Sequence, residues 1–271
     1  IREGQARRVV SLTSSTSWLS LAGLYWLKEG RNTFGSADTN DLVFPRDRAP
    51  AVLGSFRLSS GVVTVRIEPG VEVWQDSVRI SEAVLGTDAD GSPTILRHGS
   101  LSWFVIKRGK RFAIRLRDAE NPRIAAFKGI ERYPIDSSWR IPARLVPYRP
   151  PRTISVPNII GTVDEEPCPG ALVFSVGGTE FRLDPIAEAG SRQLFIVFGD
   201  ETNGRETYGG GRFVYANAPG PDVMTVIDFN KAYNPPCAFT EFATCPLPPR
   251  QNRLPIRWRS VGLAFSGAME V

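Results

Sequence analysis

Short apolar stretches, interrupted at close intervals by glycine and proline, constrain the fold of this chain more than any other feature. The 271 residues include 25 glycines and 22 prolines. Proline fixes φ and removes a backbone donor, and both residues disfavour the interior of a helix. Within the stretches, as in 61–67 and 101–109, apolar and polar residues alternate with the period of a strand that has one wet face. We therefore expect a mainly β protein built from short antiparallel strands.

The alternating runs fall into two groups, separated by a segment rich in proline and aromatic residues. We expect two packed antiparallel β lobes, with an N-terminal β-sandwich at 1–118, a connecting arm at 119–158, and a C-terminal lobe at 159–271 that is a β-barrel or a sandwich. Seven prolines exclude a long helix from the arm. Its large aromatic residues indicate an extended segment packed on a core rather than a flexible linker. These residues are Phe127, Tyr133, Trp139 and Tyr148.

The first residues are polar and basic, and 6–12 are compatible with a helix that the hydroxyl residues at 14–17 end. Residues 18–27 are strongly apolar and suit a core strand. No apolar run approaches the roughly 20 residues that cross a bilayer, so we expect no integral membrane segment. The chain begins at Ile1 rather than Met, which leaves secretion open, although a cytoplasmic location is slightly favoured.

The charged residues are interspersed rather than grouped. A net charge of +5 spread in this way indicates a solvated surface, and we expect no nucleic-acid partner. His98 is the only histidine, which weighs against a Ser-His-Asp triad and against a multi-histidine metal site. We expect no metal and no cofactor, and the sequence leaves the oligomeric state open.

The stretch from Gln193 to Leu254 concentrates acids, amides, tyrosines, arginine and cysteine among strand-forming residues and rigid turns. Gly177-Gly178, before this stretch, predicts a hairpin turn. Asn203-Gly204 predicts a type I′ hairpin, which would place Glu201 opposite Glu206, and Asn234-Pro235-Pro236 predicts a stiff turn. We expect this stiffness to gather polar side chains around one hollow in the C-terminal lobe. The candidate ligand-binding residues are Asp200, Thr202, Glu206, Tyr208, Arg212, Asp228, Asn230, Tyr233, Asn234 and Asn252.

Cys237 and Cys245 lie eight positions apart in the same stretch. Zinc sites use shorter spacings and four ligands, so a metal role is disfavoured. Two alternatives stay open, a pair of buried thiols and a disulfide that would stabilise the loop by roughly 2–3 kcal/mol in an oxidising compartment.

Several motifs resemble a bacterial and archaeal family without an assigned activity, domain of unknown function 1684. They are NTFGSADTNDLVFP, DSSWRIPARLVPY, PGALVF, FGDETNGRETYGGGRF and DFNKAYNPPCAFTEFATCPLPPRQNRLP. The resemblance implies the two-part β architecture and supplies no substrate. Residues 28–110 also resemble forkhead-associated domains, which are β-sandwiches that bind phosphothreonine peptides. The phosphate-binding arginine of that fold is replaced by Ser36, so the resemblance implies a degenerate sandwich without that site.

Three functions are compatible with these features, and the sequence does not decide whether the protein is an enzyme. The favoured one is binding of a small polar ligand at the C-terminal β lobe. The second is a hydrolase that uses Asp200, Glu206 or Asp228 as general base, with Arg212 stabilising an anion; the catalytic residues of such an enzyme are unknown. The third is a structural or protein-interaction module whose contact surface is the aromatic arm.

Overall fold

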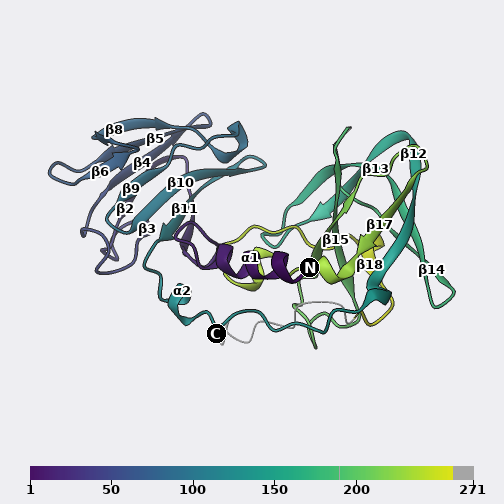
Figure 1. Ribbon diagram of the computed structural model, residues 1–271. Helices are drawn as coiled ribbons and strands as arrows, with labels where there is room; N and C mark the ends of the chain where they lie inside the picture. The colour runs from purple at the N-terminus through teal and green to yellow at the C-terminus, as the bar shows by residue number, and fades with distance from the viewer. Residues whose placement is uncertain (189, 259–271) are drawn as a thin grey trace. The chain divides into compact units, whose positions relative to one another are not determined.

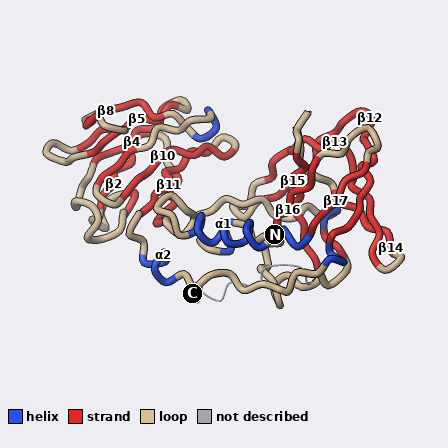
Figure 2. Tube along the Cα trace, viewed as in Figure 1, coloured by secondary structure: helices blue, strands red, loops and turns tan. Residues whose placement is uncertain are grey.

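The computed structural model describes residues 1–188 and 190–258, which form a mainly β protein as the sequence predicts (Figures 1 and 2). The chain divides into two compact units. One unit is Ser11–Phe127, and the other combines Ile1–Val10 with the described residues from Lys128 onward. We describe each unit by itself.

The Ser11–Phe127 unit consists of two sheets whose inner faces share one core. Phe34 and Phe56 of one sheet stack with ring centroids 4.2 Å apart, and Trp103 of the other sheet meets Phe34 edge-on at 5.8 Å. This arrangement is the expected sandwich. The first sheet, in the order β1-β11-β10-β9-β6-β7, comprises β1 (Leu21–Trp26), β6 (Val73–Gln75), β7 (Val78–Ile80), β9 (Leu96–His98), β10 (Leu101–Arg108) and β11 (Arg111–Asp118). The second, in the order β3-β2-β4-β5-β8, comprises β2 (Gly30–Gly35), β3 (Leu42–Val43), β4 (Gly54–Ser59), β5 (Val62–Ile67) and β8 (Glu82–Leu85).

The other unit is built on a four-stranded and a three-stranded sheet. An aromatic cluster forms its core, in which the Phe229 and Trp258 rings lie 4.3 Å apart. The larger sheet, in the order β14-β13-β12-β17, comprises β12 (Arg140–Pro157), β13 (Val163–Val176), β14 (Thr179–Leu183) and β17 (Met224–Asp228). The smaller, in the order β16-β15-β18, comprises β15 (Gln193–Asp200), β16 (Arg212–Asn217) and β18 (Arg253–Leu254).

Helices are short and few in the described residues. The basic N-terminal segment forms α1 (Arg2–Leu12), and α2 is Pro122–Ala126. The 3-10 turns relevant below are η3 (Phe229–Lys231) and η5 (Arg250–Asn252). None of the described helices is long and apolar enough to cross a membrane.

Residues 140–157, which the sequence assigns to the connecting arm, form the long strand β12. This strand pairs with β13 on one side and, through 140–144, with β17 on the other. Pro150 and Pro151 lie in an irregularity of the ladder between Pro147 and Arg152, as expected for residues without a backbone donor. Three of the four aromatic residues of the arm pack within this unit: Tyr133 is hydrogen-bonded to Glu206, the Trp139 ring lies 4.9 Å from the Trp258 ring, and Tyr148 is hydrogen-bonded to Asp184. Phe127 belongs to the other unit.

Two predicted glycine turns have different outcomes. Gly177 and Gly178, both with positive φ, join β13 to β14 as a tight hairpin, which confirms the expectation. Asn203-Gly204 does not form the predicted type I′ turn, because only Gly204 has a positive φ. The last pair of partners between β15 and β16 before the connection is Phe198 and Arg212. Residues 201–211 therefore form a wide loop between the two strands.

Candidate functional site

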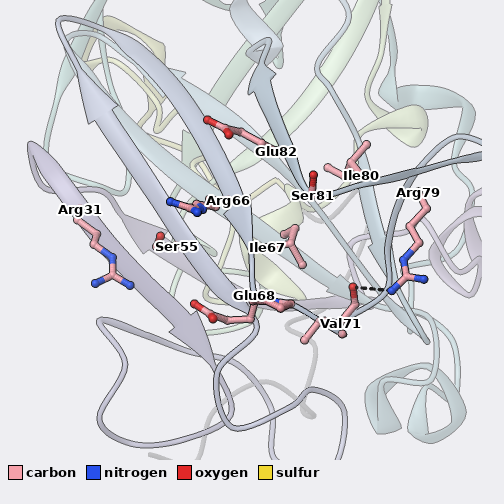
Figure 3. A pocket seen from close by; sticks show the side chains of 12 residues that line it. Arg31, Ser55, Arg66, Ile67, Glu68, Val71, Arg79, Ile80, Ser81 and Glu82 are labelled. Carbon is pink, nitrogen blue, oxygen red and sulfur yellow. Dashed lines mark hydrogen bonds between the residues drawn. The ribbon is translucent and has the colours of Figure 1, made fainter.

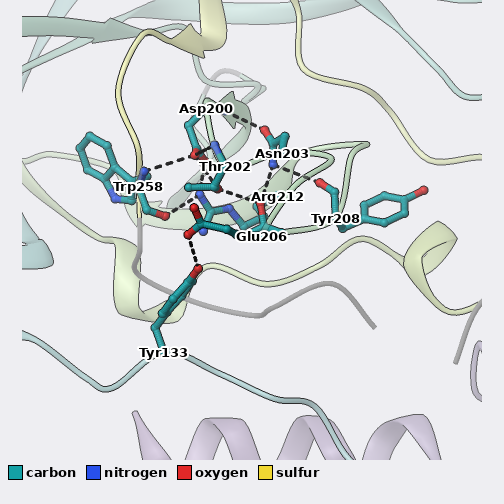
Figure 4. A network of polar contacts seen from close by, with 9 residues as sticks. Tyr133, Asp200, Thr202, Asn203, Glu206, Tyr208, Arg212 and Trp258 are labelled. Carbon is teal, nitrogen blue, oxygen red and sulfur yellow. Dashed lines mark hydrogen bonds and ion pairs between the residues drawn. The ribbon is translucent and has the colours of Figure 1, made fainter. Parts of the chain in front are cut away.

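A buried ion pair lies at the base of that loop. Asp200 ends β15 and Arg212 begins β16, and both side chains are 0% exposed. Arg212 Nη2 donates to Asp200 Oδ2 and, at 3.0 Å, to the carbonyl oxygen of Trp258 (Figure 4). Burial lowers the pKa of Arg212, and the neighbouring Asp200 carboxylate opposes that effect. The pair therefore ties two strands to the segment that carries Trp258.

The other oxygen of Asp200 is also occupied. Asp200 Oδ1 accepts hydrogen bonds from the Thr202 backbone N at 2.8 Å, from Thr202 Oγ1 at 2.6 Å and from the Trp258 backbone N at 3.2 Å. The Asp200 carboxylate thus accepts four hydrogen bonds from the protein in a buried site, and neither of its oxygens is directed at a substrate. The geometry gives Asp200 a scaffold role.

Asn203 explains why the wide loop replaces the predicted hairpin. Its Oδ1 accepts from the Asp200 backbone N at 2.7 Å, and its Nδ2 donates to Thr207 Oγ1 at 2.9 Å and to the Tyr208 carbonyl at 3.0 Å (Figure 4). Thr202 and Thr207 are buried, with their hydroxyls 2.9 Å apart. These side-chain bonds replace the backbone pairs of a two-residue turn.

Glu206 and Tyr208 point to different neighbours. Glu206 Oε2 accepts from the Tyr133 hydroxyl at 2.8 Å, and its other oxygen forms an ion pair with Arg257. The Tyr208 hydroxyl is hydrogen-bonded to the Cys237 thiol, and burial raises the pKa of Tyr208. The predicted opposition of Glu201 and Glu206 across a hairpin is wrong, because the hairpin does not form.

Cys168, Cys237 and Cys245 are buried thiols in the structure. The Cys237 backbone N lies 3.2 Å from Cys245 Sγ, so the spacing of eight residues brings the two cysteines together. The structure holds this pair in the dithiol form, and the disulfide stays a prediction. No cluster of three or more acidic, histidine or cysteine ligands suited to a metal occurs in 1–188 and 190–258.

Asp228 and Asn230 organise the end of β17. Asp228 Oδ1 accepts from the Asn230 backbone N at 3.2 Å and from Asn230 Nδ2 at 3.0 Å. Asn230 also binds the backbone of Asp136, with its Nδ2 2.8 Å from the carbonyl oxygen and its Oδ1 3.0 Å from the amide N. This amide side chain therefore holds the segment before β12.

Asn252 has a comparable role in η5 and is 1% exposed. Its Oδ1 accepts from the Asp184 backbone N at 2.7 Å, and its Nδ2 donates to the carbonyls of Asp184 and Val197, each at 2.9 Å. Because all three bonds go to the protein backbone, Asn252 joins the residue after β14 to the middle of β15 instead of facing a ligand.

Tyr233 and Asn234 meet the N-terminal helix. Arg8 of α1 donates from Nη2 to the Asn234 carbonyl at 2.7 Å, and its guanidinium carbon lies 4.2 Å from the centroid of the Tyr233 ring. A cation over an aromatic face is attracted by the ring quadrupole. Burial raises the pKa of Tyr233, so this phenol stays neutral at physiological pH.

Beside this contact lies a pocket of about 520 Å³ within one unit of the protein. Two of the predicted residues, Asn230 and Tyr233, line it, and α1 supplies the opposite wall. Four cationic side chains also line the pocket, and Glu3, paired with Arg7 at 2.9 Å, is the acid among the lining residues. The cationic residues are Arg7, Arg8, Arg132 and Lys231.

Two of these guanidinium groups are partly desolvated and close to each other. Burial lowers the pKa of Arg8; the Tyr233 phenol counteracts that, and the positive charge of Arg132 lowers it further. Burial also lowers the pKa of Arg132. Arg8 Nε and Arg132 Nη2 are buried nitrogens without a hydrogen-bond partner among the described residues. Like charges that repel each other and donors without acceptors are features that an anion would complement.

A second pocket, of about 830 Å³, lies in the Ser11–Phe127 unit (Figure 3). Its charges nearly balance, since three arginines line it together with two glutamates. Arg79 donates to the Val71 carbonyl at 3.4 Å and pairs with Glu72 at 3.4 Å. The charge balance makes this pocket a weaker candidate. Its charged residues are Arg31, Arg66, Glu68, Arg79 and Glu82.

The structure thus separates the ten predicted residues into different groups. Asp200, Thr202 and Arg212 share one buried network, whereas Asn230 and Tyr233 line the cationic pocket. Sequence reasoning missed Arg8, Arg132 and Lys231. The adjacent arginines of the N-terminal helix were a local signal, but nothing in the sequence links them to residues more than a hundred positions away.

Comparison with known proteins gives one family and two structural likenesses. Residues 125–260, just over half of the chain, match the family model described as protein of unknown function (DUF1684). No curated protein matches the chain. An uncharacterised protein from Haloarcula marismortui, solved by solution NMR, is 26% identical, with 50% of this chain and 76% of that chain covered and a TM-score of 0.43. A phosphothreonine-dependent FHA domain is 16% identical, with 35% and 92% covered and a TM-score of 0.25. Both TM-scores are below 0.5, so neither likeness is evidence for a shared fold or function.

Proposed function

The chain belongs to DUF1684, a family of proteins of unknown function, and we propose from its geometry that it binds a small anionic ligand. The site is the pocket between α1 and the segment from Asn230 to Tyr233. This proposal keeps the polar ligand and the lobe that the sequence favours, and it moves the site away from Asp200 and Arg212.

The observation that carries the proposal is the pair Arg8 and Arg132. Both guanidinium groups line one pocket, and each retains a buried nitrogen without a partner among the described residues. A buried donor without a hydrogen-bond partner costs free energy, and the cost is larger for a charged donor than for a neutral one. A carboxylate or phosphate oxygen placed between the two groups would satisfy both donors and remove their repulsion.

Arg8 is also held in position before any ligand arrives. Its hydrogen bond to the Asn234 carbonyl and its contact with the Tyr233 ring fix the side chain. A binding group that is already ordered loses less side-chain entropy when the ligand binds. Lys231 is 60% exposed and lies 3.7 Å from Asp228 Oδ2, so it adds charge at the rim.

The two alternatives have less support. A carboxylate hydrolase needs an available base, and Asp200 is fully engaged by Thr202, Trp258 and Arg212. A module that binds proteins through its aromatic arm needs exposed rings, and Tyr133, Trp139 and Tyr148 contact residues of their own unit.

Isothermal titration with inorganic phosphate and pyrophosphate tests the proposal. Arg132→Met removes one guanidinium and leaves the bond between Arg8 and Asn234 in place. A charge-assisted hydrogen bond contributes about 1.5–3 kcal/mol, so we expect the variant to bind these anions at least about tenfold more weakly. Arg192→Met is the matched control, because Arg192 is exposed and does not line the pocket.

The affinities of the wild type for phosphate and for pyrophosphate should also fall as the sodium chloride concentration is raised, because salt screens a charged site. Equal affinity of the wild type and Arg132→Met for both anions would refute the proposal. Failure of the wild type to bind any of a panel of phosphates and carboxylates would refute it as well.

A further inference from the structure

The second half of β12 is paired on one side only. β13 pairs with 152–157 along one edge, while β17 reaches only 140–144 on the other edge. Within the described part of the chain, no strand pairs with 152–156 on that second side. The unpaired part of this edge ends at Pro157, whose carbonyl oxygen accepts a hydrogen bond from the Leu247 backbone N at 2.7 Å. An unpaired strand edge presents backbone N–H and C=O groups to an incoming extended chain.

Residues of this part of β12 line a groove of about 910 Å³. One side is formed by Thr153, Ile154 and Ser155 of β12, and further lining residues come from η5 and β18, among them Arg250 and Arg253. All of these residues belong to a single unit of the protein. A sheet edge therefore lies in the same groove as side chains from a distant part of the sequence.

Four arginines make the lining of the groove cationic, although the Glu165 carboxylate accepts from the Thr153 and Ser155 hydroxyls beside it. Arg152, Arg182, Arg250 and Arg253 line it, and Asp184 is the acidic residue among the lining side chains. Asp184 is 3% exposed, and its carboxylate is occupied by the Tyr148 hydroxyl at 2.8 Å and by Arg152 Nη2 at 3.2 Å. The remaining positive charge has its natural complement in an acidic partner.

Part of this charge is fixed in place. The Arg152 guanidinium carbon lies 3.7 Å from the centroid of the Tyr148 ring, and Arg182 Nη2 donates to the Tyr148 hydroxyl at 3.1 Å. Asp184, which orients Tyr148, is held through its backbone by Asn252. Arg182 and Arg152 are therefore preorganised beside an open strand edge.

We propose that this groove binds an acidic peptide segment in an extended conformation, which adds to β12 as a further strand. Backbone hydrogen bonds to the edge supply affinity, and the arginines select glutamate or aspartate side chains. The site is separate from the small-anion pocket, since the two share no lining residue.

The probe is a synthetic eight-residue peptide of alternating glutamate and threonine, titrated into the ¹⁵N-labelled protein and followed by NMR. We expect saturable amide shifts at 153–156 and about tenfold weaker binding for the double variant Arg250→Gln, Arg253→Gln. Arg205→Gln is the matched control, because Arg205 is an exposed arginine outside the groove. Arg132→Met should bind the peptide as the wild type does, which separates this test from that of the small-anion pocket.

A second peptide, N-methylated at every backbone nitrogen, keeps the charge but cannot donate a backbone hydrogen bond to β12 along either of its edges. Loss of binding by this peptide supports strand addition. Equal binding of both peptides, equal binding of a single-stranded oligonucleotide of the same charge, or no binding of the first peptide would each overturn the proposal.

Discussion

At the scale of the residue, the most polar motif of the sequence stabilises the fold. Asp200 and Arg212 are fully buried and bonded to each other. A buried ion pair is costly to break, because removing one partner leaves the other charge desolvated. The density of polar residues around this pair therefore reflects the bonding needs of a buried loop rather than a ligand.

Arg212→Met tests that role. The variant leaves the Asp200 carboxylate buried without its counter-charge, so we expect the free energy of unfolding to fall by about 3–5 kcal/mol. Urea denaturation measures the change. Arg192→Met removes an exposed arginine and should stay within about 0.5 kcal/mol of the wild type. A loss of less than about 1 kcal/mol for Arg212→Met would show that the pair is not structural.

Tyr25 gives the fold a defined response to alkaline pH. Burial raises the pKa of Tyr25 to about 12, and its hydroxyl donates to the Val43 carbonyl at 2.6 Å. The unfolded chain loses this proton near pH 10, so between about pH 10 and 12 the folded state binds more protons and its stability falls as pH rises. The variant Tyr25→Phe has no phenol proton to lose and therefore lacks this pH dependence. The difference in unfolding free energy between wild type and variant should narrow from pH 8 to pH 11, and a constant difference would contradict the assignment.

At the scale of the element, the sequence predicts the type of secondary structure better than it predicts which strands pair with each other. The mainly β fold, the strands with period-two alternation and the Gly177-Gly178 turn are confirmed, because each depends on local chemistry. The hairpin at Asn203 is wrong, because the Asn203 side chain bonds three backbone or side-chain groups of a wider loop. The participation of 140–157 in the sheet was not predicted. The prolines of this segment argue against a regular strand, and the ladder that β12 forms is irregular.

Asn252 tests how elements are joined in the C-terminal part of the chain. Asn252→Ala leaves backbone groups of Asp184 and Val197 buried and without their amide partner. Each such group costs about 1–3 kcal/mol, so we expect a loss of at least about 2 kcal/mol in urea denaturation. Asn217→Ala, at an exposed position of β16, is the matched control. Similar stability of the two variants would show that Asn252 does not connect the strands.

At the scale of the whole molecule, the proposed anion site depends on residues that only the folded chain brings together. Arg8 comes from the N-terminal helix, Arg132 from the segment before β12, and Tyr233 from the segment after η3. No local motif encodes such a combination, which is why the sequence indicates the lobe and two of its lining residues but not the arginines. The division into a lobe, an arm and a second lobe at 118 and 158 stays a prediction beside the two compact units.

The most direct test of the proposed function is an NMR titration that follows the arginine Nε–Hε signals while inorganic phosphate is added. We predict saturable shifts for Arg8 and Arg132 at one common affinity, and an unchanged signal for Arg212, which is buried against Asp200. A shift of Arg212 without shifts of Arg8 and Arg132, or weak and unsaturable shifts of all exposed arginines alike, would contradict it.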